Sequence, residues 1–214
     1  MSLVVNEIFH SIQGESSFAG LPCTFIRLTG CNLRCSYCDT PYAYEEGLRM
    51  SIAEVLSRAG NPVGRLVEVT GGEPLIQPEA PLLVAGLLED GNTVLVETNG
   101  SVDIRCLPPG CVAIVDVKCP SSQMSGRMDF ENLRRLRPAD ELKFVIRDAQ
   151  DYRWARSLLH DLPRPPAPGR ILFSPAWPDL DPGPLAEWIL ADRLSVRLQI
   201  PLQRVLWPAA TRGR

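Results

Sequence analysis

The chain has 214 residues, 45% of them hydrophobic, and a formal net charge of −3 at pH 7. This length and composition fit a globular protein with a sizeable core, and we expect residues 1–214 to form one domain with its core between residues 20 and 200. The negative charge argues against a nucleic-acid-binding surface, which would be basic.

Other features of the sequence bear on where in the cell the protein is expected. No run of about 18 apolar residues is present, so a membrane span is not expected. The N-terminal segment has no positive region followed by a long apolar run, so it does not read as a secretory signal. Seven cysteines occur, three of them close together. Reduced, metal-binding cysteines in the cytoplasm fit this pattern better than disulfides do.

Short apolar runs rich in branched residues alternate with helical patterns along the chain. The predicted strands are 24–28, 66–70, 93–98, 113–118, 142–146, 171–174 and 195–199. The predicted helices are 51–59, 79–90, 129–137, 149–160 and 184–192. Ser51 and Asp129 are the expected N-caps, and Gly60 and Gly91 stand where C-caps belong. The alternation predicts an α/β fold with a mostly parallel sheet, and proline-rich 162–169 and 175–184 are expected to be loops.

Polar residues gather where the predicted strands end. They include the segments 70–73, 97–100 and 116–118, and Ser174. In parallel α/β sheets and barrels the active site lies at the carboxyl ends of the strands. We therefore expect residues that are scattered in the sequence to converge at one edge of the sheet.

Three cysteines, Cys31, Cys35 and Cys38, fall within eight residues in the spacing C-x3-C-x2-C. The run is too tight for a disulfide framework and suits thiolates that converge on a metal centre. Three thiolates could bind three irons of a [4Fe-4S] cluster and leave the fourth iron open. The alternatives are a zinc site completed by His10 or His160, and three buried structural cysteines.

Two further features admit a structural and a functional interpretation. The segment Thr70-Gly71-Gly72-Glu73-Pro74 is either a tight turn after a strand or a ligand-binding loop, since glycines let the backbone approach a ligand closely. Arg27 lies in an apolar strand, where a buried cation needs an anion. That anion is either an internal carboxylate such as Glu15 or Glu97, or a ligand.

Several of these segments together resemble a known family. The cysteine spacing followed by Asp39-Thr40 is the signature of the radical S-adenosylmethionine (SAM) enzymes. Within them, the segment 9–15 (FHSIQGE), the strand 25–28, the cysteine motif and the segment 70–74 resemble the 7-carboxy-7-deazaguanine synthase family. The resemblance is strong over residues 6–120 and weaker afterwards. It implies a single-domain, partial β/α barrel of the radical SAM type, which seven strands and five helices can supply.

The resemblance also implies site residues. Cys31, Cys35 and Cys38 are the implied ligands of a [4Fe-4S] cluster, and Cys23, Cys106, Cys111 and Cys119 are not. The implied SAM contacts are Tyr37, Cys38, Asp39, Gly72, Glu73, Asp116, Val117, Lys118, Ser174 and Pro175. The implied substrate contacts are Ile12, Gln13, Gly14, Glu15, Arg27 and Thr70. Thr40 is the implied ligand of Mg2+, for which a hydroxyl is a fair hard-oxygen ligand.

One segment departs from the pattern. Members of the family often carry Gln-x-His-Lys near the C-terminus, whereas Gln203 and Arg204 stand here in place of the histidine and lysine. We therefore carry no role over to this segment.

The activity implied is the ring contraction of 6-carboxy-5,6,7,8-tetrahydropterin to 7-carboxy-7-deazaguanine with loss of ammonia, in queuosine and 7-deazapurine biosynthesis. Reductive cleavage of SAM would supply a 5′-deoxyadenosyl radical. A flavodoxin- or ferredoxin-type reductant and a cytoplasmic homodimer are implied as well. The alternative within the enzymes is an activase that makes a glycyl radical on a partner protein. The alternative outside them is a zinc-stabilised binding module without catalysis.

Overall fold

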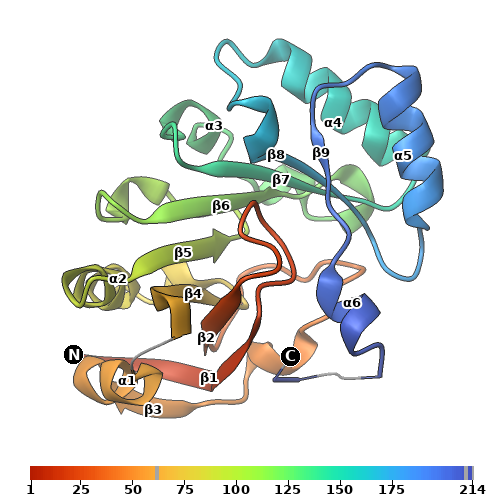
Figure 1. Ribbon diagram of the computed structural model, residues 1–214. Coiled ribbons are helices and arrows are strands. Elements are labelled where there is room, and N and C mark those ends of the chain that lie inside the picture. The colour runs from red at the N-terminus through yellow and green to blue at the C-terminus, as the bar shows by residue number, and fades with distance from the viewer. Residues whose placement is uncertain (61–62, 210–211, 214) are drawn as a thin grey trace.

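The computed structural model describes residues 1–60, 63–209 and 212–213, and a nine-stranded sheet forms its centre (Figure 1). The strands are β1 (Ser2–Ile12), β2 (Pro22–Leu28), β3 (Leu48–Ser51), β4 (Leu66–Gly71), β5 (Thr93–Thr98), β6 (Val112–Val117), β7 (Glu141–Ile146), β8 (Ile171–Pro175) and β9 (Arg197–Leu198). Their order across the sheet is β3-β1-β2-β4-β5-β6-β7-β8-β9. Because β3 and β9 are edges that do not pair with each other, the sheet is open.

The parallel part of the sheet confirms the predicted architecture. From β2 to β9 every neighbouring pair is parallel, and these seven strands correspond to the seven predicted ones. The last of them is shorter than expected, since only Arg197 and Leu198 pair with β8. The fold is therefore α/β with a mostly parallel, open sheet, as the sequence predicted.

Two strands were not predicted. Strand β1 pairs antiparallel with both β2 and β3, and it precedes the first expected strand. Its inner residues Leu3 and Val5 are buried, but its second half is only partly buried and includes Asn6, Glu7 and His10. Since polar residues interrupt the apolar alternation there, the segment lacks the run that marked the other strands.

The helices are α1 (Ile52–Ala59), α2 (Ala80–Glu89), α3 (Asn132–Arg135), α4 (Ala149–Asp161), α5 (Pro182–Ala191) and α6 (Leu202–Leu206). Ser51 caps α1 in a reciprocal capping box with Glu54, and Gly60 ends that helix, both as expected. Gly91 follows α2 with a positive φ of 78°, which favours glycine.

The third predicted helix is wrong in length. Helix α3 has four residues rather than the nine expected over 129–137. Asp129 accepts a hydrogen bond from the Glu131 amide, so it caps a turn before the helix instead of the helix itself. The Asn132 side chain donates to the Gly100 and Val102 carbonyls, which fixes this short segment to the loop after β5.

The two faces of the parallel strands have different characters. One face packs against the helices and forms the main core, with Ile26, Val69, Val96 and Phe144 among its buried residues. On the opposite face a smaller apolar cluster lies near the beginnings of the strands, at Cys23, Phe25, Leu66, Leu95, Val112 and Ile114. Two residues further along each strand this face turns polar. The sequence period of two thus places an apolar layer beneath a polar one.

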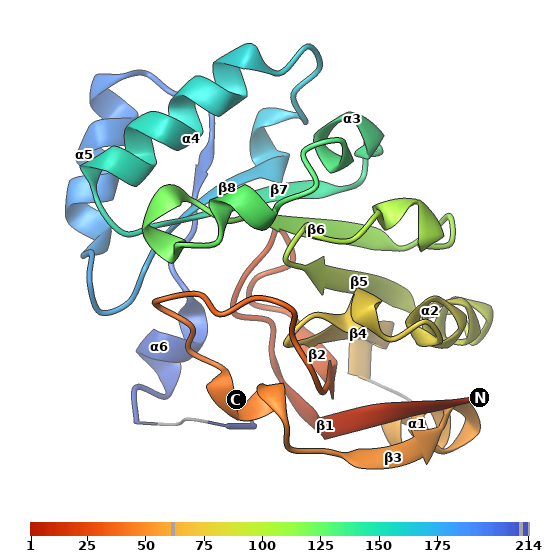
Figure 2. The ribbon, with the colours of Figure 1, turned by 180° about the vertical axis from the view of Figure 1, so that it is seen from behind.

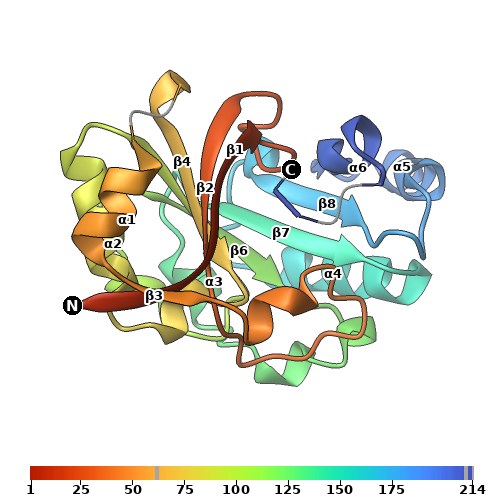
Figure 3. The same cartoon turned by 90° about the horizontal axis from the view of Figure 1, so that it is seen from below.

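The polar layer faces the segment after β1 and helix α6. Figures 2 and 3 show helices α1 to α5 around the outside of the sheet. The segment after β1 is tied to α6 by a 3.0 Å hydrogen bond from the Leu202 amide to the Gly14 carbonyl. In the described part of the chain, no helix is both long and apolar enough to cross a membrane.

Candidate active site

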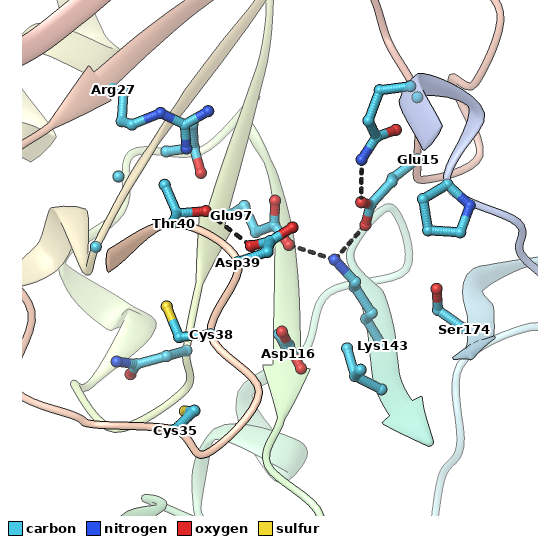
Figure 4. A pocket seen from close by; sticks show the side chains of 18 of the residues that line it. Glu15, Arg27, Cys35, Cys38, Asp39, Thr40, Glu97, Asp116, Lys143 and Ser174 are labelled. Carbon is cyan, nitrogen blue, oxygen red and sulfur yellow. Dashed lines mark hydrogen bonds and ion pairs between the residues drawn. The ribbon is translucent and has the colours of Figure 1, made fainter. Parts of the chain in front are cut away.

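A cavity lies at the carboxyl ends of the parallel strands, where the polar layer was expected (Figure 4). It is lined by the cysteine loop after β2, the segment after β1, the ends of β4 to β8, and residues of α6. Residues separated by almost 200 positions therefore meet in one space. This confirms the expectation that the scattered polar segments converge at one edge.

The cysteine loop follows β2 and packs against the glycine turn after β4. A Cβ atom added at Gly72 would lie 2.3 Å from the Gly30 carbonyl oxygen and 2.7 Å from the Cys31 Cβ. A Cβ at Gly71 would lie 2.2 Å from the Leu28 carbonyl oxygen. The two glycines therefore let the turn approach the cysteine loop and β2. Close packing is thus a second reason for glycine here, in addition to the close approach of a ligand that the sequence suggested.

Cys31, Cys35 and Cys38 all line the cavity, and all three are free thiols. The Cys31 sulfur accepts a 3.4 Å hydrogen bond from the Leu33 amide and a 3.8 Å contact from the Asn99 side chain. Burial raises the pKa of Cys31 and of Cys35, while the Lys118 ammonium opposes that rise for both. Donors and a cation thus surround sulfurs that a metal centre would hold as thiolates.

The two histidines do not complete a zinc site at this loop. The His10 ring pairs with the Thr24 hydroxyl at 2.8 Å, and His160 lies exposed near the end of α4. Neither lines the cavity. Within residues 1–60, 63–209 and 212–213, no three histidine, cysteine or acidic side chains converge closely enough to hold a single metal ion.

The remaining cysteines lie away from the cavity. Cys23, Cys111 and Cys119 are buried in the packed interior, and Cys106 is exposed. None of these four residues lines the cavity. The geometry therefore separates them from the three cysteines of the motif.

Glu73 holds the glycine turn together. Its carboxylate accepts hydrogen bonds from the Leu75 amide at 3.0 Å, the Thr98 hydroxyl at 2.8 Å and the Asn99 amide at 2.6 Å. The side chain is fully buried and does not line the cavity. Burial raises its pKa to about 7, against these hydrogen bonds. Glu73 thus has a structural role that links β4 to the end of β5.

Lys118 and Asp116 form a buried ion pair in the cavity wall at the end of β6. The Lys118 ammonium donates to Asp116 Oδ2 at 2.6 Å, while Asp116 Oδ1 is buried without a hydrogen-bond partner among the described residues. Burial disfavours the ammonium, but the charge of Asp116, the hydrogen bond to it and the charges of Cys35 and Tyr37 together raise the pKa of Lys118. The orphaned oxygen is suited to a donor on a bound molecule, such as a ribose hydroxyl of SAM.

Most of the other implied SAM contacts also line the cavity. They are Tyr37, Cys38, Asp39, Gly72, Ser174 and Pro175. Val117 does not, because its side chain alternates to the other face of β6 and is buried in the main core. Only the backbone of Val117 is left for a ligand, so the implied contact with SAM would be made by its main chain.

The implied substrate contacts form the opposite wall, and all six line the cavity: Ile12, Gln13, Gly14, Glu15, Arg27 and Thr70. The Gln13 amide donates to the buried Glu68 carboxyl on β4. Gly14 leaves room for α6, since a Cβ atom there would lie 1.8 Å from Gln203 Oε1. Glu15 accepts a 2.8 Å hydrogen bond from the Gln203 side chain.

The internal partner of Arg27 differs from the two that the sequence suggested. Its Nε donates to Glu7 Oε1 at 2.8 Å, and its guanidinium lies 5.9 Å and 5.8 Å from the ring centres of Phe9 and Tyr42. Glu7 faces Arg27 directly across the β1–β2 pairing. Because β1 was not predicted, Glu7 was not considered. The guanidinium still lines the cavity.

Thr40 and Asp39 lie together at the mouth of the cavity. The Thr40 hydroxyl donates to Asp39 Oδ1 at 2.8 Å, and Arg204 on α6 pairs with Asp39 Oδ2 at 3.1 Å. Two hard oxygen groups therefore stand next to each other, a donor set that Mg2+ can use. The interaction also gives Arg204, to which the sequence assigned no role, a place at the site.

Two charged residues in the cavity wall, Glu68 and Lys143, were not identified from the sequence, and Glu97 was considered only within the polar segment 97–100 and as a possible partner of Arg27. Each lies inside an apolar strand with apolar neighbours on both sides or on one side. A charged residue in such a run is costly unless it is paired. The same argument that singled out Arg27 could have found all three.

Comparisons with known proteins agree with this geometry. The chain matches the model of the radical SAM superfamily over residues 25–108. The 7-carboxy-7-deazaguanine synthases of Koribacter versatilis and Chlorobaculum tepidum are each 41% identical to it, over 98% and 99% of this chain and 99% and 97% of theirs. A crystal structure of QueE from Escherichia coli has a TM-score of 0.76 at 26% identity, with 94% of each chain covered.

The radical SAM family implies a [4Fe-4S] cluster and SAM, and the free cysteines and the orphaned Asp116 oxygen fit these groups. The resemblance seen in the sequence is thereby confirmed. The chain belongs to the 7-carboxy-7-deazaguanine synthase family and is a radical SAM enzyme, a carbon–nitrogen lyase.

Proposed function

We propose that this chain converts 6-carboxy-5,6,7,8-tetrahydropterin to 7-carboxy-7-deazaguanine and ammonia in a Mg2+-dependent radical SAM reaction. The observation that carries the proposal is the composition of one cavity. The motif cysteines line it together with a second, polar set formed by Gln13, Glu15 and Arg27. An activase for a partner protein has no need of this second set.

The first set of residues holds the cofactors. Cys31, Cys35 and Cys38 bind the cluster, and the implied SAM contacts other than Glu73 and Val117 line the same cavity. Lys118, held by Asp116, presents its ammonium group to SAM, and Gly72 offers its backbone. When bound, the cluster and SAM supply the one-electron chemistry that removes a hydrogen atom from the pterin. The chain itself positions the two molecules and excludes side reactions.

The second set binds the pterin. Arg27 binds the substrate carboxylate through the part of its guanidinium that Glu7 leaves free, since the fork has several N–H donors. Gln13 and Glu15 bind the ring edge, and Ile12, Gly14 and Thr70 complete the wall. Anchoring at both ends of the molecule fixes the reacting carbon in the orientation that the reaction needs.

Thr40 is a ligand of Mg2+, whose other ligands are substrate oxygens and water. The Thr40 hydroxyl donates its proton to Asp39, so its lone pairs would be available to the metal. Replacement by valine removes this ligand with little change in volume. Turnover of Thr40→Val should fall, and added Mg2+ should restore it only in part, because misplacement of the substrate is the defect. Wild-type turnover that is indifferent to chelation of Mg2+ contradicts this assignment.

The setting of the reaction is proposed with it. The enzyme acts as one domain spanning residues 1–214, as a homodimer in the cytoplasm, within queuosine or 7-deazapurine biosynthesis. A flavodoxin- or ferredoxin-type protein supplies the electrons. No nucleic acid and no membrane takes part.

The decisive experiment is anaerobic turnover of the reconstituted enzyme with SAM, dithionite, Mg2+ and carboxytetrahydropterin, followed by the mass of the product. We expect 7-carboxy-7-deazaguanine and one ammonia per turnover. Metal analysis of the same sample should give about four iron and four sulfide per chain, and Cys35→Ala should lose them. About one zinc per chain, or an unchanged pterin in the presence of a full cluster, would overturn the proposal.

A further inference from the structure

Lys143, the second of the chain's two lysines, has no part in the function proposed so far, yet it lies in the wall of the cavity. Its ammonium group stands between the carboxylates of Glu15 and Glu97, as Figure 4 shows, and lies 2.6 Å from Glu97 Oε1. The lysine comes from β7, Glu97 from β5, and Glu15 from the segment after β1. One cation therefore joins three separate parts of the fold at the substrate wall.

The charges in this group do not cancel. Burial disfavours the Lys143 ammonium, but the charges of Glu15 and Glu97 outweigh it and raise the pKa of the lysine well above its usual range. Burial, together with the charge of Glu97, raises the pKa of the neighbouring Glu68 and favours its neutral form. One ammonium therefore stands against two carboxylates, and the excess negative charge faces the cavity.

The other charged and polar groups around Lys143 leave this balance in place. Asp116, opposite Lys143 in the β6–β7 register, is already paired with Lys118. The amides of Gln199 and Gln203 contact Glu15 at 3.1 Å and 2.8 Å without adding charge. Asp39 pairs with Arg204. Lys143 is thus the cation in contact with Glu15 and Glu97.

The two carboxylates are not fully enclosed. The Glu15 and Glu97 side chains are 22% and 25% exposed, whereas the Lys143 side chain is only 7% exposed. All three residues line the cavity, and the two carboxylates are the more exposed of them. The edge of a pterin ring carries N–H donors, which a pair of ionised carboxylates in fixed positions can accept.

We propose that Lys143 is a positioning residue for substrate recognition, whose charge holds Glu15 and Glu97 together and aimed at the N–H donors of the pterin ring, and that Glu97 is a substrate contact. This inference rests on the proposed function. A lysine suits the task better than the arginine that the chain uses elsewhere, because a compact ammonium can sit between two carboxylates at short distance.

The variant Lys143→Met removes the cation and keeps the length of the side chain. Without the cation the two neighbouring carboxylates repel each other, which favours proton uptake by one of them. We expect the KM for carboxytetrahydropterin to rise at least about tenfold relative to wild type at pH 7, with a smaller change in kcat. The ratio of the variant's KM to that of wild type should fall as the pH rises to 9, because a higher pH favours the ionised carboxylates. The affinity for 6-carboxypterin, measured by calorimetry, should follow the same course.

Two further variants separate positioning from structure. The double variant Glu97→Gln, Lys143→Met lacks both the cation and one of the two carboxylates. The ratio of its KM to that of wild type should therefore no longer depend on pH. Arg137→Met is the matched control, because it removes the cation from Asp140, whose carboxylate is buried outside the cavity. It should lower Tm and leave the KM and its pH profile as in wild type.

The inference is overturned if Lys143→Met lowers Tm but keeps the pH profile of wild type, or if the double variant keeps the pH dependence of the single one. Lys143→Arg retains the charge, so its KM relative to wild type should not change with pH. This variant keeps the test available if Lys143→Met folds poorly. If wild type makes no 7-carboxy-7-deazaguanine, the proposed function fails, and the calorimetric pH profile with 6-carboxypterin alone then decides on Lys143.

Discussion

Arg27 shows how one side chain serves the fold and the site together. Its guanidinium pairs with Glu7 on β1, lies near the rings of Phe9 and Tyr42, and still lines the cavity. Arg27 and Glu7 are both largely buried, at 14% and 19% exposure of the side chain. Loss of either partner therefore leaves an uncompensated charge behind.

The two members of this pair should differ in their effect on binding. Arg27→Ala should raise the KM for the pterin by an amount equivalent to about 2–5 kcal/mol, because it removes both the internal pair and the bond to the substrate carboxylate. Glu7→Gln breaks the same internal pair but keeps the guanidinium. Glu7→Gln should lower Tm about as much as Arg27→Ala does, and it should leave the KM for the pterin nearly unchanged. Equal effects of both variants on the KM would restrict Arg27 to its structural pair.

The two lysines offer a matched test at the same scale. Lys118→Arg should weaken SAM binding, because a planar fork cannot replace the point charge that lies 2.6 Å from Asp116. Lys143→Arg makes the same change on the neighbouring strand, beside the substrate wall, and should leave SAM affinity as it is. Equilibrium dialysis of SAM against the reconstituted proteins measures both. Equal SAM affinity in wild type and Lys118→Arg would make Lys118 a structural residue only.

At the scale of the elements, the alternation along each strand builds the site. A residue on the concave face is apolar near the start of a strand and polar two positions later, as in Leu66 and Glu68 or in Leu95 and Glu97. The neighbouring strand repeats this pattern two residues further along, since Glu68 on β4 lies opposite Leu95 on β5, so the polar residues form a layer that runs obliquely across the strands. The loops that follow then supply the cysteines and the glycine turn.

The contact between the cysteine loop and the glycine turn predicts a position that tolerates no side chain. Gly72→Ala places a Cβ 2.3 Å from the Gly30 carbonyl oxygen, so the cysteine loop must shift. We expect reconstituted iron per chain to fall severalfold, with a smaller change in Tm. Gly183→Ala is the control, because nothing lies within 4 Å of its added Cβ and alanine suits the helix α5 better. Full iron content in Gly72→Ala would show that the loop adapts.

At the scale of the whole molecule, the buried carboxyl of Glu73 couples stability to pH. Its pKa is raised by burial from 4.5 to about 7, so the folded protein binds this proton more tightly than the unfolded chain. The stability that protonation contributes is present below pH 4.5 and is lost as the pH rises through 7. The amount is on the order of 3 kcal/mol.

Glu73→Gln removes this titration. Wild type should lose stability relative to Glu73→Gln when the pH is raised from 5 to 7.5, although the variant is less stable at every pH because one amide N–H must face a donor. Urea midpoints of both proteins at the two pH values provide the measurement. Because the other titrating groups are common to both proteins, they cancel in the comparison. A constant difference between the two proteins would show that Glu73 stays ionised.

The sequence by itself determined the features that depend on local patterns. The seven parallel strands, most of the helices and the convergence of polar segments followed from apolar runs, caps and the direction of parallel strands. The cysteine spacing and the segments around it indicated the family, and the comparisons confirmed it. All of these are properties of short stretches, so they can be read without knowing which stretches meet.

The tertiary structure decided the features that depend on which stretches meet. Arg27 pairs with Glu7 because β1 lies beside β2. This pairing could not be predicted, since polar residues interrupt the apolar pattern of β1. Glu73 turns away from the cavity because Thr98 and Asn99 at the end of β5, together with the Leu75 amide, offer it three donors. Val117 faces the core because the side chains of β6 alternate between its two faces. Lys143 lies between Glu15 and Glu97 because β7, β5 and the segment after β1 meet at one edge. A charge buried in a strand indicates that it needs a partner, but only the packing of distant segments determines which one.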